Sequence, residues 1–181
     1  MSALVNTTTP RFVILSGCSG GGKSTLLAEL GRRGYPSVPE PGRRIVAEEV
    51  ATGGGALPWV DPAAFLRRAI TMAQADYDIA ADRAGWVFFD RGLVDAAAGL
   101  AHLTGQSVPA ELPRYHHQVF LTPPWPEIYV RNGERQHGLD AAIAEYDRLL
   151  RDYPALGYAV TIVPRLPVAE RADFVLAELG L

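Results

Sequence analysis

The sequence predicts a three-layer α/β fold built on a five-stranded parallel sheet. Five short apolar segments alternate along the chain with longer segments of helical pattern, which is the order that β-α-β units require. A glycine-rich turn at residues 17–24 joins the first apolar segment to the first helical one. Polar residues follow several of the apolar segments, and in a parallel sheet the carboxyl ends of the strands meet at one edge. We therefore expect a functional site at that edge.

The predicted strands differ in how deeply they should be buried. Residues 12–15 and 86–89 are apolar throughout, as is typical of strands covered on both faces. Pro36 and Pro39 restrict their segment to an edge or irregular strand, because proline donates no backbone hydrogen bond. The five expected strands are residues 12–15, 35–39, 86–89, 118–121 and 158–163.

The predicted helices are supported by end signals and by apolar spacing. Asp61 is an expected N-cap, with Pro62 in the first turn. Leu139, Ala142 and Tyr146 follow helical spacing, so that helix should pack one face inward. The expected helices are residues 24–30, 43–51, 61–84, 92–104 and 139–150, with a closing helix opened by Pro167.

Length and composition indicate one globular domain over residues 1–181, with residues 1–10 as a flexible N-terminal tail. A net charge of −3 gives no reason to expect nucleic acid or an anionic membrane as a partner. The chain has one cysteine, no apolar run of transmembrane length and no secretory signal. We expect a cytoplasmic protein of undetermined oligomeric state.

Residues Gly17–Ser24 fill the pattern G-x-x-x-x-G-K-[ST], which is typical of a phosphate-binding loop. Glycines allow backbone amides to converge on an anion, and the positive end of the next helix points at the same place. Lys23, the only lysine of the chain, would bind the β- and γ-phosphates. The alternative, a glycine-rich connector, is disfavoured by the strand-loop-helix context. The expected nucleotide-binding residues are Gly17, Cys18, Ser19, Gly20, Gly21, Gly22, Lys23, Ser24 and Thr25.

Asp90 is the expected metal partner of this loop. It ends an apolar strand, as does the carboxylate that orients Mg²⁺ in phosphate-loop enzymes. The Ser24 hydroxyl is the second expected magnesium ligand. Alternatively, Asp90 could cap the next helix. Its neighbour Arg91 could contact a phosphate or pair with an acidic residue.

Glu40 ends the second expected strand, where a carboxylate can accept the proton of an acceptor hydroxyl or hold a metal-bound water. The alternative is a solvated loop residue. The next helix begins with Arg43 and Arg44 and ends with Glu48 and Glu49, which is the reverse of what the helix dipole favours. An anionic ligand near the helix start would explain this reversal.

Residues 125–138 are the expected lid of the site. Arg131 and Arg135 would share one helical face, and Gly133 would make the segment mobile. Arginines on such a lid can close over a phosphoryl group during its transfer. The alternative is a solvated loop in which Glu134 pairs with an arginine.

With these motifs in view, the chain resembles the AAA-related predicted ATPases that share a domain with NadR-type nicotinamide riboside kinases. It is more distantly similar to thymidylate and deoxynucleoside kinases. The resemblance covers nearly the whole chain and includes the phosphate loop, the Glu40-Pro41 pair and the Asp90-Arg91 pair. It extends to the segment 131–135 and to the region from Val163 to Arg171.

This resemblance implies a kinase-like sheet of order 2-3-1-4-5, with an arginine lid. It also implies that Glu40 lies on the acceptor side and that residues 164–168 lie beside the adenine. Thymidylate kinases have a further glycine where Arg43 stands, and deoxynucleoside kinases usually have serine where Gly92 stands. The resemblance therefore implies the chemistry but leaves the acceptor open.

The predicted function is phosphoryl transfer from ATP, with Mg²⁺, to a small-molecule acceptor. The alternatives are hydrolysis of ATP with water as acceptor, and a nucleotide-sensing module without catalysis. Guanine specificity is disfavoured, because an Asn-Lys-x-Asp element would need a second lysine. The expected catalytic residues are Lys23, Glu40, Asp90, Arg91, Arg131 and Arg135.

Overall fold

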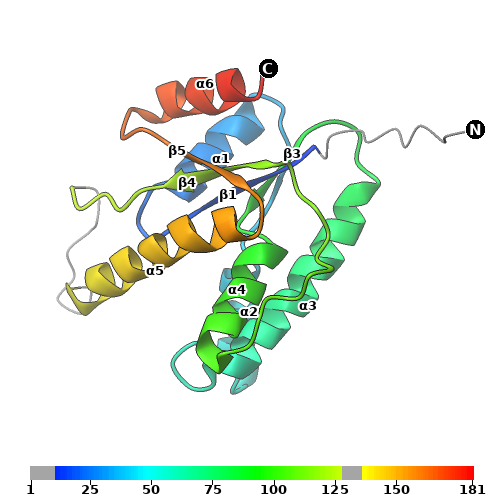
Figure 1. The fold of residues 1–181 in the computed structure, drawn as a ribbon, viewed down its shortest axis with the longest axis vertical. Coiled ribbons are helices and arrows are strands. Elements are labelled where there is room, and N and C mark those ends of the chain that lie inside the picture. Colours follow the sequence, from blue (N-terminus) through cyan, green and yellow to red (C-terminus); the bar gives the residue numbers. More distant parts are fainter. Residues whose placement is uncertain (1–10, 128–135) are drawn as a thin grey trace, which may run out of the picture.

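The computed structural model describes residues 11–127 and 136–181 (Figure 1). These residues contain one five-stranded sheet, in which every neighbouring pair of strands is parallel and the order is β2-β3-β1-β4-β5. Both the strand order and the edge position of the proline-flanked strand are as predicted. The strands are β1 (Phe12–Gly17), β2 (Ser37–Val38), β3 (Val87–Asp90), β4 (Gln118–Thr122) and β5 (Ala159–Ile162).

The helices agree with the prediction to within a few residues at most ends. The second helix begins at Pro41 rather than Arg43, because the fixed φ of proline suits a first helical turn. The Asp61 carboxylate accepts a hydrogen bond of 2.9 Å from the Ala64 amide, as an N-cap should. No helix within the described ranges is both long enough and apolar enough to cross a membrane. The helices are α1 (Lys23–Arg32), α2 (Pro41–Thr52), α3 (Pro62–Ala81), α4 (Leu93–Thr104), α5 (Gln136–Ala155) and α6 (Val168–Glu178).

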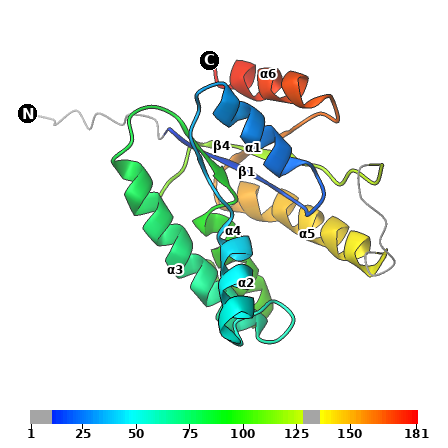
Figure 2. The ribbon, with the colours of Figure 1, turned by 180° about the vertical axis from the view of Figure 1, so that it is seen from behind.

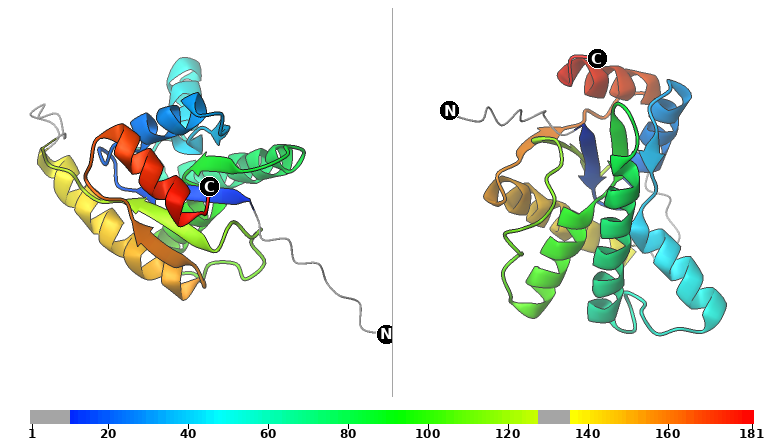
Figure 3. Two further views of the ribbon diagram at one scale, coloured as in Figure 1. Left: turned by 90° about the horizontal axis from the view of Figure 1, so that it is seen from above. Right: turned by 90° about the vertical axis from the view of Figure 1, so that its right-hand side faces the viewer.

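Helices cover both faces of the sheet, which gives the predicted three layers (Figures 1 and 2). Alternate residues of β1 face opposite layers: Val13 and Leu15 pack with α1 and α6, whereas Ile14 packs with the layer that contains α4 and α5. Burial on both faces explains why residues 12–15 and 87–89 of the central strands are apolar. On the face of the sheet that α4 and α5 cover, α2, α3 and α4 extend beyond the sheet as a group of neighbouring helices (Figure 3).

The parallel register brings the carboxyl ends of the strands together at one edge. Leu15 pairs with Asp90, and Gly17 pairs with Thr122. The phosphate loop therefore leaves β1 beside the end of β3 on one side and the end of β4 on the other. Glu40 follows β2 at the same edge, so the fold gathers the predicted site residues that end or follow β1, β2 and β3.

Candidate functional site

The loop between β1 and α1 has the backbone conformation of an anion-binding turn. Gly17, Gly20 and Gly22 have φ values of 120°, 81° and 76°, which side-chain-bearing residues rarely adopt. A Cβ atom at Gly17 would lie 2.3 Å from the carbonyl oxygen of Thr122, and one at Gly21 would lie 2.7 Å from the Thr122 hydroxyl. The end of β4 thus lies so close to the loop that only glycine fits at positions 17 and 21.

Lys23 lies inside this loop rather than on the surface. Its side chain is buried, and its ammonium donates to the carbonyl oxygens of Gly17 and Cys18 at 3.4 and 3.2 Å. Burial lowers the pKa of Lys23, and the nearby Arg91 lowers it further, while Asp90 is the strongest opposing charge. The cation is therefore held in the cradle that the glycines form, where a bound phosphate would compensate its desolvation.

Asp90 is buried at the end of β3, and burial raises the pKa of its carboxyl group against the opposing charge of Lys23. Its Oδ1 atom has no hydrogen-bond partner among the described residues. It does not cap the next helix, since Asp95 accepts the Gly92 amide there at 2.8 Å. Asp90 and Ser24 line the same cavity of about 340 Å³. Carboxylate and hydroxyl oxygens are ligands that Mg²⁺ prefers, so both residues fit the expected metal.

Arg91 joins three elements of the site. Its guanidinium donates to both carboxylate oxygens of Glu145 on α5, at 2.6 and 3.2 Å, and to the carbonyl oxygen of Gly17 at 3.1 Å. Its Nε atom lies 3.4 Å from a carboxylate oxygen of Glu40. Although burial opposes the charge, Glu145 and Glu40 raise the pKa of Arg91 above its ordinary value. Of the two predicted roles, pairing with acidic residues is the one present in this structure.

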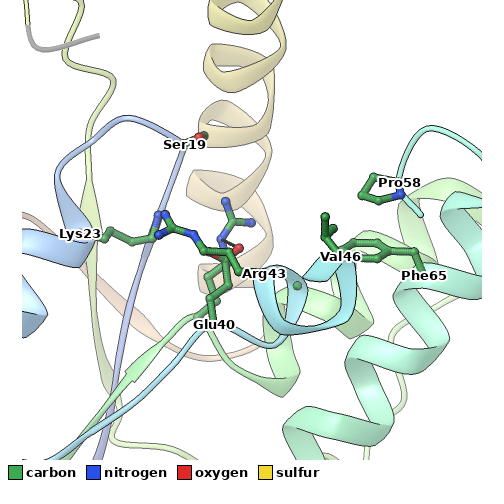
Figure 4. Close-up of a pocket in the computed structure, with 9 residues that line it drawn as sticks. Ser19, Lys23, Glu40, Arg43, Val46, Pro58 and Phe65 are labelled. Atoms are coloured by element: carbon green, nitrogen blue, oxygen red, sulfur yellow. Dashed lines mark ion pairs between the residues drawn. The ribbon is translucent and has the colours of Figure 1, made fainter. Parts of the chain in front are cut away.

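Glu40 stands between the phosphate loop and an apolar wall. Its side chain is 18% exposed and also pairs with Arg43 at 3.0 Å, so it is not a freely solvated loop residue. Figure 4 shows another cavity, also of about 340 Å³, with Lys23 and Glu40 at one end and Val46 and Phe65 toward the other. The charged end lies beside the expected phosphates, and the apolar end is supplied by α2 and α3.

A third, narrower cavity of about 130 Å³ shares part of the apolar wall shown in Figure 4. The two cavities have Glu40, Gly42, Phe65 and Arg91 in common. The narrower one continues between α3, α4 and α5, and Glu145 is one of its lining residues. Together they can hold a molecule that presents one polar group to Glu40 and an apolar body to the helices.

The reversed charges of α2 have a structural explanation. At the start of the helix Arg44 pairs with Asp76 of α3, and at its end Glu48 and Glu49 both pair with Arg68 of α3. These ion pairs offset the unfavourable interaction of the charged side chains with the helix dipole. An anionic ligand is therefore not needed to explain this charge pattern.

The sequence did not predict two residues of the site, Glu145 and Arg171. Two residues that it did predict lie outside the described ranges. Glu145 follows no motif, and its partner Arg91 is 54 positions away in the chain. Arg171 was noted only as part of the resemblance, although its guanidinium contacts the phosphate loop. The predicted lid residues Arg131 and Arg135 fall in the segment 128–135, outside the residues that the structure describes. The same holds for the predicted tail, residues 1–10.

Comparison with solved structures identifies kinases of the same architecture. The deoxyadenosine kinase from M. mycoides with bound dATP gives a TM-score of 0.60 at 16% identity, over 94% of this chain and 100% of that one. The same kinase with dCMP and dCDP gives 0.61 at 15% identity, over 93% and 98%. Thymidylate kinase from Ehrlichia chaffeensis gives 0.60 at 14% identity, over 96% and 100%. At such low identity these similarities establish the fold, which is that of nucleoside kinases with a phosphate loop.

Comparison at the sequence level gives one family. The family model described as an AAA domain (AAA_28) matches residues 12–171, which is most of the chain. Among curated proteins, none matches the sequence.

Proposed function

The chain belongs to the AAA domain family, and we propose that it is an ATP- and Mg²⁺-dependent phosphotransferase acting on a small molecule. One observation supports this function above all others. A complete phosphate loop with a buried lysine opens directly onto a cavity that is charged at the loop and apolar beyond it. Such a cavity has room for an acceptor next to the phosphoryl group to be transferred.

In this proposal the loop and Lys23 hold the triphosphate. The backbone amides of residues 17–24 and the positive end of α1 would bind the β-phosphate region, and Lys23 would reach the β- and γ-phosphates. Ser24 and Asp90 would hold Mg²⁺, which when bound neutralises charge on the phosphate oxygens. Because phosphoryl transfer needs little covalent help from the protein, placement and fixed charge would supply most of the catalysis.

Glu40 is the proposed acceptor-side residue. It lines both cavities and faces the phosphate loop across the Arg91 guanidinium. From this position its carboxylate could orient an acceptor hydroxyl and accept the hydroxyl proton. Arg91 would fix the position of Glu40 and add positive charge beside the loop. Arg131 and Arg135 are proposed to act from the lid.

Replacing Lys23 by alanine tests the phosphate-binding role. Lys23→Ala should reduce ATP turnover by roughly 100-fold or more, since it removes a preorganised charge from the reacting phosphates. ADP release from Mg·ATP is the measurement, made with and without an extract of cell metabolites. Arg32→Ala is the matched control, because Arg32 is an exposed cation at the far end of the same helix. Near-normal ADP release by Lys23→Ala would contradict the proposed function.

Simple ATP hydrolysis is the second candidate, and a nucleotide sensor is the third. The apolar wall formed by Val46, Pro58 and Phe65 favours an acceptor larger than water. A kinase should release ADP slowly until its acceptor is added, whereas a hydrolase should show the same rate throughout. Tight binding of ATP without turnover in any extract would favour a sensor. Mass spectrometry of the products formed with Mg·ATP and the extract would identify the acceptor.

A further inference from the structure

Arg171 is a buried cation whose surroundings do not neutralise it. Arg171 belongs to α6, and the residue is 5% exposed. Among residues 11–127 and 136–181, no aspartate or glutamate forms an ion pair with it, and burial lowers the pKa of its guanidinium. Its Nε atom also has no hydrogen-bond partner there. Buried charges in proteins are normally paired, because desolvation of an unpaired charge is costly.

The guanidinium is held against the phosphate loop by three contacts. It donates to the carbonyl oxygen of Gly22 at 3.1 Å and to the Thr25 hydroxyl at 3.3 Å. Its central carbon lies 5.5 Å from the ring centroid of Trp125, which follows β4. A Cβ atom at Gly22 would come within 2.8 Å of the guanidinium, so the glycine allows this close approach. The side chain is thus fixed in place at the loop.

The position is also electrostatically unfavourable for a cation. Arg171 lies near the start of α6, and its guanidinium reaches the start of α1. Helix N-termini carry partial positive charge, so both helix ends disfavour a nearby cation and favour an anion. An anion bound at this point would satisfy Arg171 and both helix ends together.

We propose that Arg171 is a nucleotide-binding residue that contacts the phosphate group nearest the ribose. Lys23 and Asp90 mark the end of the loop where transfer would occur, whereas the guanidinium of Arg171 contacts Thr25, two residues beyond Lys23 on α1. A triphosphate that enters the cradle from the Thr25 side would place its α-phosphate beside the guanidinium. Trp125 would hold the plane of the guanidinium in place through its ring face. The role assigned to Arg171 depends on the proposed function, since the anion is the nucleotide.

The experiment compares Arg171→Met with a matched control in the same pair of helices. Arg33 also ties α1 to α6, through Asp173 at 2.5 Å and the Ala169 carbonyl at 3.0 Å, but it does not touch the loop. If Arg171 only joins the two helices, Arg33→Met should weaken nucleotide binding to a similar extent. The affinity of each purified variant for Mg·ATP and Mg·ADP is measured by calorimetry, together with its melting temperature without nucleotide.

Arg171→Met should bind both nucleotides about 10- to 100-fold more weakly, since a charge-assisted contact is lost. Arg171→Lys should show a smaller loss, because it keeps the charge without the planar fork. Arg33→Met should stay within about two-fold of the unaltered protein. The melting temperature of Arg171→Met should not fall, because methionine removes an unpaired buried charge.

Unchanged affinity in Arg171→Met, or equal losses in Arg171→Met and Arg33→Met, would overturn the role of Arg171. A strongly lowered melting temperature in Arg171→Met would also overturn it, since the side chain would then be a structural tie. If the unaltered protein bound no Mg·ATP, the proposed function and the role of Arg171 would both fail. If the unaltered protein bound Mg·ATP and Arg171→Met bound it equally well, only the role of Arg171 would fail.

Discussion

The Asp90 carboxylate is unfavourably placed for a charged group. It is buried at the end of β3, and one of its oxygens has no partner among the described residues. Burial raises its pKa, although the positive charge of Lys23 partly opposes this effect. A metal-binding carboxylate can tolerate such a site because the ion compensates its charge when it binds.

Asp90→Asn should therefore stabilise the protein while impairing turnover. Since the folded-state pKa of Asp90 is raised, the folded protein holds this proton more tightly than the unfolded chain, and stability falls as the pH rises through the folded pKa. Asparagine does not titrate, so Asp90→Asn does not lose stability in this way. Its free energy of unfolding should exceed that of the unaltered protein by the full amount above the folded pKa of Asp90, and this difference should be absent below about pH 3.8. Urea unfolding at several pH values is the measurement.

Turnover of Asp90→Asn with Mg·ATP should fall by roughly 100-fold or more, because the amide is a poor magnesium ligand and carries no charge. A variant that is less stable at pH 7 than the unaltered protein would contradict the electrostatic account. A variant that keeps full magnesium-dependent turnover would contradict the metal role of Asp90.

The junction of β1, α4 and α5 depends on one buried carboxylate, that of Asp95. It accepts hydrogen bonds from the Gly92 amide at 2.8 Å and from the Tyr153 hydroxyl at 2.7 Å, and it also accepts from the Ser16 hydroxyl. Burial, and then the charge of Asp95, raise the pKa of Tyr153, so its hydroxyl stays protonated and donates. The bond to Gly92 fixes the start of α4 directly after Arg91.

Two substitutions should separate the parts of this junction. Tyr153→Phe removes one hydrogen bond to a charged group and should lower the free energy of unfolding by about 1.5–3 kcal/mol. Asp95→Ala removes all three bonds, including the helix cap, and should cost more. Chemical denaturation with a constant m-value is the measurement. If Asp95→Ala were no more destabilising than Tyr153→Phe, the carboxylate would not be the organising group of the junction.

The elements were predictable because their signals are local. The apolar run at residues 12–15, the proline pair around β2 and the Asp61 cap each act through neighbours in the chain. The phosphate loop was also predictable, since its motif specifies backbone geometry directly. The pairing of Arg91 with Glu145 was not, because α5 brings the two together by tertiary packing alone. For the same reason the Arg68 pairs that balance α2 could not be inferred from the helix itself.

The cleft as a whole depends on both layers of helices. α1 and α6 supply Lys23 and Arg171 at the loop, whereas α2, α3, α4 and α5 supply the wall around Glu40. Nucleotide binding should therefore stabilise the entire domain and not only the loop. The loop also packs on Thr122 of β4, so the central strands share in any stabilisation of the loop.

Mg·ATP should raise the melting temperature of the unaltered protein by about 5–11 °C at a concentration of 100 times its Kd. Binding to the folded state alone adds about 2.7 kcal/mol at that ratio, and a domain of this size gains roughly 2–4 °C for each kcal/mol. Thermal unfolding followed by circular dichroism, with and without Mg·ATP, measures the shift. Lys23→Ala should lose most of it at the same concentration, because its affinity is lower, while Arg32→Ala should keep it. An equal shift in Lys23→Ala would mean that ATP binds outside the phosphate loop, and the site described above would then be wrong.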